Sequence, residues 1–220
     1  MKDLRAGGFE VGVHGLRHDG KLFSSHRQFL RRAVHINGYV RDFAAVGFRA
    51  PLTQRQPEWM QALDIEYDAS FFDTDPYEPI PGGTMSVWPF QMGRFVELPY
   101  TLVQDHTLAS ILHETTPRLW LEKVAFLRSV HGMALLITHP DYLRSPQTWR
   151  IYSDFLRTMR ERGDYYHALP REVARWWRAR ASATGLDGLP AGTVAEVTEA
   201  GGVGLPAIRC ASPNGSSWVA

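Results

Sequence analysis

Two histidines stand four positions apart in the stretch His14-Gly15-Leu16-Arg17-His18-Asp19-Gly20, which directly follows the apolar run 9–13. The alternation in that run indicates a short strand, and the glycines indicate that the chain then turns. Neutral imidazole is the commonest metal-binding side chain, and a pair at the carboxyl end of a strand can converge on one zinc-like ion. The spacing therefore predicts half of a metal site, with two unrelated surface histidines as the alternative.

A similar change from apolar to polar residues recurs downstream. In each case an apolar or aromatic segment gives way to one polar residue where the chain turns: Gly47-Phe48-Arg49-Ala50-Pro51, Tyr67-Asp68-Ala69-Ser70 and Leu135-Leu136-Ile137-Thr138-His139-Pro140-Asp141. Barrels of alternating strands and helices place their chemistry at such strand ends. These segments are therefore candidate parts of one site.

Composition narrows the class of protein. The chain has 220 residues, of which 44% are hydrophobic and 21% are charged, so we expect one globular domain with a small appendage. The formal net charge of +1 predicts no nucleic-acid binding. The single cysteine, Cys210, excludes an intrachain disulfide and a cysteine-based zinc site. The amino terminus is too polar for a signal peptide, and no apolar run is long enough for a membrane span, so we expect a soluble, cytoplasmic protein.

Helical and strand-like patterns alternate through about residue 183, which predicts an α/β fold with a parallel sheet or barrel. We expect helices at 24–45, 54–63, 107–112, 117–130, 146–162 and 170–183, and strands at 9–13, 48–49, 65–70, 95–98, 133–138 and 165–168. The 133–138 segment is fully apolar and is expected to be buried on both faces. The Gly/Pro-rich tail 184–220 is expected to be weakly β or disordered, with 193–197 and 205–210 as its strand candidates and 212–220 frayed.

Over residues 1–183 these motifs resemble those of the polysaccharide deacetylases, the carbohydrate esterase family with the NodB-homology fold, a distorted TIM-like β/α barrel. His14 and His18 correspond to the family's second motif, whose histidines bind a divalent metal, usually zinc. The 47–51 segment corresponds to the third motif, so the resemblance implies that Arg49 orients the catalytic carboxylate and that Pro51 lines the substrate groove. The 135–139 segment corresponds to the fifth motif, in which His139 would be the general acid.

The chain departs from the family pattern in two places. The Asp68 segment lies where the fourth motif is expected, but it lacks the tryptophan at the usual spacing. The first motif, an acidic pair that supplies the third metal ligand and the catalytic base, has no counterpart, because Asp3 and Glu10 are the acids before His14. Asp19 is an alternative ligand. We therefore expect an incomplete barrel that lacks its first βα unit, whose open edge favours self-association.

The expected activity is metal-dependent removal of acetyl groups from an N- or O-acetylated saccharide, a hydrolysis of carbon–nitrogen bonds other than peptide bonds, impaired by the missing acidic motif. A metal can lower the pKa of bound water and stabilise the oxyanion, and a protonated His139 can donate to the leaving amine. The alternatives for Arg49 and His139 are a surface ion pair and a strand end capped by Asp141.

Two other functions stay open. One is a non-catalytic carbohydrate-binding remnant of the same fold, and the other is a different metal amidohydrolase of the allantoinase-like kind. Aromatic residues make up 12% of the chain and serve either core packing or sugar stacking. Trp88 and Tyr100 are expected to contact the saccharide together with Pro51. The wider set of candidate groove aromatics is Phe72, Tyr77, Trp88, Phe90 and Tyr100.

Overall fold

The computed structural model describes residues 2–74, 82–183, 195–197, 208–211 and 217–219. Its helices are α1 (Lys2–Ala6), α2 (His26–Asp42), α3 (Pro57–Met60), α4 (Arg118–Ser129), α5 (Pro146–Glu161) and α6 (Pro170–Ala183), with short turns η1 (Pro51–Thr53) and η2 (Thr107–Ile111). Its strands are β1 (Gly47–Phe48), β2 (Tyr67–Asp68), β3 (Phe90–Met92), β4 (Phe95–Glu97), β5 (Ala195–Val197), β6 (Ile208–Ala211) and β7 (Ser217–Val219). The chain is thus mixed α/β, as expected.

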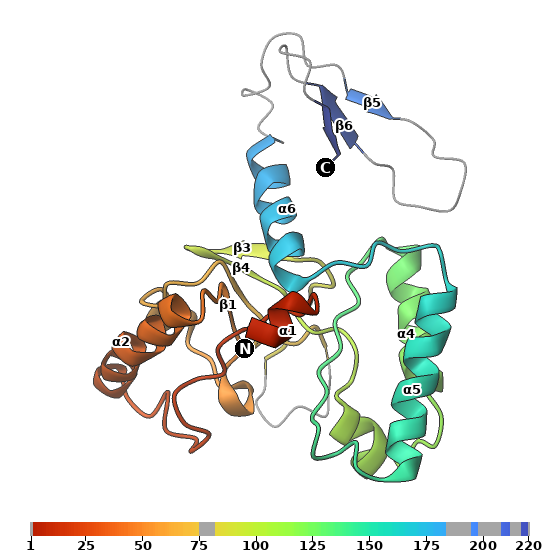
Figure 1. Ribbon diagram of the computed structural model, residues 1–220, viewed down its shortest axis with the longest axis horizontal. Coiled ribbons are helices and arrows are strands. Elements are labelled where there is room, and N and C mark those ends of the chain that lie inside the picture. Colours follow the sequence, from red (N-terminus) through yellow and green to blue (C-terminus); the bar gives the residue numbers. More distant parts are fainter. Residues whose placement is uncertain (1, 75–81, 184–194, 198–207, 212–216, 220) are drawn as a thin grey trace.

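A four-stranded sheet in the order β1-β2-β4-β3 lies at the centre (Figure 1). Strands β1, β2 and β4 are parallel, as the alternation of strands and helices predicts. Strand β3 was not expected. It turns back antiparallel on β4 through the hairpin at Gly93, which has a φ of 59°.

Isolated parallel bridges extend this sheet on both sides. Val13 bridges to Phe48 next to β1, and Leu102 bridges to Leu136 beyond β4. No strand pairing joins the Val13 segment to the Leu136 segment among the described residues, so the sheet is open and not a closed barrel. We call the space between these two segments the open edge.

The open edge explains one wrong prediction. The 133–138 segment was expected to be a strand buried on both faces, but it pairs only at Leu136, and Ala134 is exposed. Parallel strands are buried on both faces only when neighbours and helices cover them. The expected strand at 165–168 does not form either, and the strands at 9–13 and 65–70 reduce to a bridge at Val13 and to β2.

Helix α2 forms the largest core with the sheet. It begins after Ser25, whose hydroxyl accepts a hydrogen bond from the backbone N–H of Gln28, one of the two caps that the sequence offered. Its buried face follows the helical period, and burial of each large apolar side chain there contributes about 1.5–3 kcal/mol. The core residues that α2 contributes to this cluster are Phe29, Ala33, Ile36 and Val40, which pack with Val13 and Phe48.

Helices α4 and α5 pack against each other on the opposite side of the sheet from α2 (Figure 1), around Trp120, Val124 and Phe155. Helix α6 has the predicted bounds and covers the sheet through Ala174, next to Val96 and Leu98.

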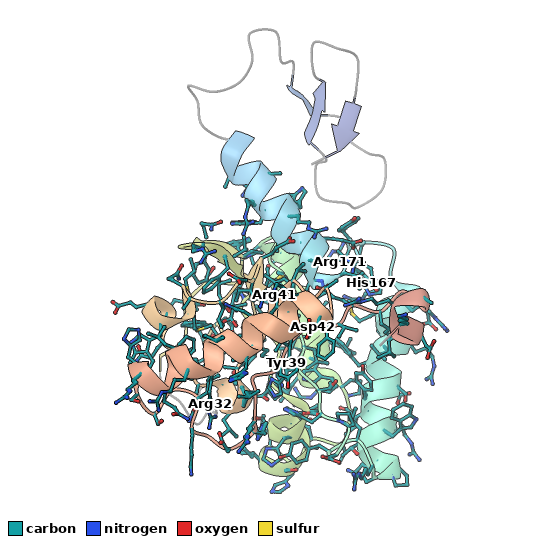
Figure 2. All side chains as sticks on the ribbon, turned by 60° about the vertical axis from the view of Figure 1, so that its left-hand side comes forward. Arg32, Tyr39, Arg41, Asp42, His167 and Arg171 are labelled. Atoms are coloured by element: carbon teal, nitrogen blue, oxygen red, sulfur yellow. The ribbon has the colours of Figure 1, made fainter. Side chains whose placement is uncertain are left out.

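Glu10 connects α6 to the amino-terminal side of the sheet. Its Oε1 accepts from the Tyr67 hydroxyl at 2.9 Å, and its Oε2 accepts from the backbone N–H of Arg171 at 3.0 Å. Arg171 stands at the start of α6 (Figure 2). The Tyr67 ring reaches Glu10 across Gly47, where a Cβ would lie 2.0 Å from the ring, so only glycine fits at that position. Glu10 therefore has a structural partner for each oxygen.

In the tail, β5, β6 and β7 form a three-stranded antiparallel sheet in that order. Strands β5 and β6 overlap the two expected strand candidates, and Ser217–Val219 is a strand within the segment that was expected to be frayed. The expectations for 184–194, 198–207, 212–216 and 220 lie outside the described residues.

Within the described ranges, the helices are too short or too polar to cross a membrane.

Candidate functional site

The loop that carries the two histidines is fixed at both ends. It leaves the sheet at Val13, and Gly15 turns it with a φ of 73°, where a Cβ would lie 2.8 Å from Pro51. At the other end, Asp19 accepts two hydrogen bonds of 2.7 Å from the guanidinium of Arg32 on α2 (Figure 2). Because Arg32 is only 8% exposed, this bidentate pair ties the loop to α2.

The predicted pair of histidines does come together. The ring centroids of His14 and His18 lie 5.6 Å apart, with the planes tilted by 51°. His14 Nδ1 lies 2.7 Å from the carbonyl oxygen of Arg49. A carbonyl only accepts hydrogen bonds, so Nδ1 carries the hydrogen and Nε2 keeps its lone pair, as in a metal-ligating histidine.

The environment keeps the His14 ring neutral. Partial burial lowers its pKa below 6.5, the carbonyl of Arg49 opposes this, and the charges of Arg49, His18 and His139 lower it further. His14 follows the bridge at Val13 and His139 follows the bridge at Leu136, on the two sides of the open edge. Four of the predicted site residues, His14, His18, Arg49 and His139, thus share the carboxyl end of the sheet.

Sequence reasoning missed the partner of His139. Asp105 Oδ1 lies 2.8 Å from His139 Nδ1, and its Oδ2 accepts from the His139 backbone N–H at 2.6 Å. Asp105 is 3% exposed, so a buried carboxylate contacts both the ring and the backbone of His139. Asp141, the expected cap, pairs with Arg144 instead. The sequence holds one signal for Asp105, which is the mainly apolar run 98–103 that ends just before it. In the structure this run lies beside 135–137.

The three residues predicted to contact the saccharide differ in their exposure to solvent. Pro51 is buried beside Gly15, directly under the histidine loop. Trp88 is 43% exposed and donates from its indole nitrogen to the carbonyl of His131 at 3.1 Å. Tyr100 is 0% exposed and packs on Phe72, so the expectation that its ring lines a saccharide groove does not agree with its position in the core.

Of the other candidate groove aromatics, Phe72 is 4% exposed and Phe90 is half-buried. Tyr77 lies outside the described residues. Trp88 is therefore the predicted groove aromatic with the largest exposed surface in the described part of the chain.

The two histidines fit a divalent metal as two of its ligands, because His14 presents Nε2 and His18 lies beside it. A third ligand is not provided by the described residues, among which no group of three or more His, Cys, Asp or Glu side chains could hold a metal ion. Asp19 is not available as that ligand, because both of its oxygens accept hydrogen bonds from Arg32. Glu10 is bound on both oxygens by Tyr67 and Arg171.

Comparison with solved structures identifies this architecture. The fold is similar to the crystal structure of a proposed polysaccharide deacetylase from Mycobacterium smegmatis, with a TM-score of 0.61 and 19% sequence identity over 82% of this chain. The chain spans 66% of the length of that protein. No protein-family model and no curated protein matches the sequence. At this level of identity the likeness establishes a common fold, and the chemistry has to be argued from the residues.

Proposed function

We propose that the chain is a hydrolase of the polysaccharide deacetylase type that removes acetyl groups from an N- or O-acetylated saccharide. The observation that carries the proposal is the placement of the His14–His18 pair and the Asp105-supported His139 directly after parallel bridged segments, at one end of the sheet. The similarity to the fold of the mycobacterial protein supports the same assignment.

In this proposal His139 is the general acid. Asp105 keeps the hydrogen on Nδ1 and stabilises a positively charged ring, which leaves Nε2 to donate a proton. When the acetyl carbon–nitrogen or carbon–oxygen bond breaks, that proton goes to the departing amine or alkoxide of the sugar. Arg49, whose charge acts on His14, corresponds to the arginine that orients the catalytic carboxylate in the family, but the described residues place no such carboxylate beside the histidines.

We propose that His14 and His18 hold a divalent metal, with zinc as the expected ion. A bound metal would supply a more acidic water and a Lewis acid for the acetyl carbonyl. Since the described residues supply neither the third ligand nor a carboxylate base beside the histidines, we expect weak metal binding and low turnover from this chain as given.

The lack of a third metal ligand and of a carboxylate base among the described residues favours a second candidate function, a non-catalytic carbohydrate-binding protein. Trp88, which has exposed ring surface, is the residue that we would expect to stack on a sugar in this case, whereas the predicted groove residue Pro51 is buried under the histidine loop. The open edge also leads us to propose self-association, because unpaired strand edges are templates for pairing between chains.

The test measures acetate released from acetylated chitooligosaccharides and from a fluorogenic acetyl ester, with added zinc or cobalt. The deacetylase proposal expects release that a chelator abolishes and that His14→Ala removes. His35→Ala, which changes an exposed histidine on α2, is the matched control and should retain the activity. Saccharide binding without acetate release, unchanged by chelator and lost in Trp88→Ala, would overturn the deacetylase proposal in favour of the binding protein. Release of product from non-sugar amides alone would indicate a different amidohydrolase.

A further inference from the structure

Two carboxyl groups are buried side by side in the sheet and take no part in the proposed chemistry. The parallel register places Asp68 on β2 directly beside Glu97 on β4, and both residues are 0% exposed. Two carboxylates cannot both be ionised at this spacing without water, so the pair shares one proton. Burial raises the pKa of both carboxyls, but hydrogen bonds from Glu97 and Ser70 oppose the rise in Asp68, whereas the charge of Asp68 adds to it in Glu97, so Glu97 is the protonated partner.

The remaining oxygen of Glu97 agrees with this assignment. Glu97 Oε1 accepts from the backbone N–H of Phe71 at 3.2 Å, whereas Oε2 is buried and no N–H or O–H donor reaches it among the described residues. A protonated carboxyl oxygen needs no donor, because it carries its own hydrogen. Asp68 is thereby left as a carboxylate with both oxygens available on its other side.

Asp68 uses those oxygens to orient Ser70. Asp68 Oδ1 accepts from the Ser70 hydroxyl at 2.7 Å, and Oδ2 accepts from the Ser70 backbone N–H at 3.0 Å. Because the hydroxyl hydrogen points to Asp68, the oxygen presents its lone pairs outward, and it accepts from the backbone N–H of Ala50 at 2.8 Å. The buried pair thus fixes the direction in which Ser70 accepts.

The N–H of Ala50 and the carbonyl of Arg49 belong to the same peptide unit. That carbonyl accepts from His14 Nδ1 at 2.7 Å, so one peptide plane connects Ser70 on one side to the imidazole on the other. The peptide begins a loop with stored backbone strain, since Leu52 and Thr53 have φ values of 57° and 51°. Strain of this kind persists only where the surroundings hold the backbone firmly.

We propose that Glu97, Asp68 and Ser70 are positioning residues for His14, which clamp the Arg49–Ala50 peptide so that the imidazole keeps its hydrogen on Nδ1 and its lone pair on Nε2. The expected effect on metal binding rests on the proposed function, whereas the expected effect on the tautomer of His14 does not. We call Glu97, Asp68 and Ser70 the clamp. It gives a role to Asp68 and Ser70, the polar residues of the 67–70 segment, for which the resemblance to the deacetylases implies none.

The experiment uses the full chain and two readouts. Nitrogen-15 NMR of the metal-free protein at pH 8 reports which ring nitrogen of His14 carries the hydrogen, and cobalt titration followed by visible absorption reports metal affinity. The variants are Ser70→Ala, Ser70→Thr, which restores the hydroxyl, and Asp68→Asn. Ser129→Ala is the control, because it removes a serine hydroxyl that donates to the carbonyl of Phe126 on α4, away from these residues.

The wild type and Ser129→Ala should show one His14 tautomer with the hydrogen on Nδ1. Ser70→Ala and Asp68→Asn should shift the ring toward the other tautomer and lower cobalt affinity about 10- to 100-fold, as loss of outer-shell partners does, and Ser70→Thr should recover both readouts to within about threefold. An unchanged tautomer in both Ser70→Ala and Asp68→Asn would overturn the clamp. A wild-type chain that binds no cobalt would contradict the proposed function while the tautomer still tests the clamp.

Discussion

Replacement of Glu97 by glutamine should change how the stability of the fold depends on pH. Glu97 holds its proton more tightly in the folded chain than in the unfolded chain, because burial raises its pKa well above 4.5. The stability that the neutral carboxyl contributes is therefore fully present below pH 4.5 and is lost as pH rises toward the raised pKa. In that window the free energy of unfolding should fall by about 1.4 kcal/mol per pH unit.

Glutamine has nearly the same volume and no proton to lose, so Glu97→Gln should remove this slope. The charge of Arg55 acts in the opposite direction on Glu97, but burial and Asp68 act more strongly. Glu97 and Asp68 take up one proton as a pair. The pH dependence of the free energy of unfolding is therefore a property of both residues together.

The assay is urea unfolding between pH 5 and 8, followed by the fluorescence of the seven tryptophans. Histidine titrations are common to both proteins and cancel in the difference. Glu66→Gln is a suitable control, because hydrogen bonds from Arg175 lower the pKa of Glu66, so its contribution is present throughout this range and is lost only at lower pH. A difference between wild type and Glu97→Gln that stays constant from pH 5.5 to 7.5 would refute the reasoning.

Substitutions of Trp120 and Lys123 test the contacts of α4, and each has a comparison variant elsewhere. Trp120 is 1% exposed and donates to the carbonyl of Val103, so Trp120→Ala should cost about 3–5 kcal/mol in urea unfolding, whereas Trp149→Ala, at a residue 57% exposed, should cost under about 0.5 kcal/mol. Lys123 Nζ lies 2.6 Å from the buried carboxylate of Asp73, and Lys123→Met should cost about 3–5 kcal/mol by leaving that charge unpaired. Adding Asp73→Asn should recover most of this loss, and equal stability of the single and double variants would contradict the argument.

The helices could be predicted well because their signals are local. The cap at Ser25 and the apolar period of α2 define that helix without any knowledge of its neighbours, and Pro170 marks the start of α6. The placement of His14, Arg49 and His139 directly after parallel segments could also be predicted, because parallel strands place the residues that follow them at a common edge. Their proposed roles in metal binding and catalysis stay predictions.

The errors concern properties that depend on what lies beside a segment. The 133–138 run has the composition of a buried strand, but burial requires a neighbour on each side, and the open edge supplies none among the described residues. Tyr100 has a polar ring suited to sugar contact, yet it is fully buried against Phe72. Asp105 was missed because its importance comes from His139, which lies 34 residues away in sequence.

The ion pair between Asp19 and Arg32 has a consequence for the dynamics of the molecule. Since Arg32 lies on the buried face of α2, the loop with His14 and His18 cannot separate from the body without breaking a bidentate contact to that helix. The loop and α2 should therefore open as one cooperative unit, and amide hydrogens in the loop should exchange with solvent in step with those of α2.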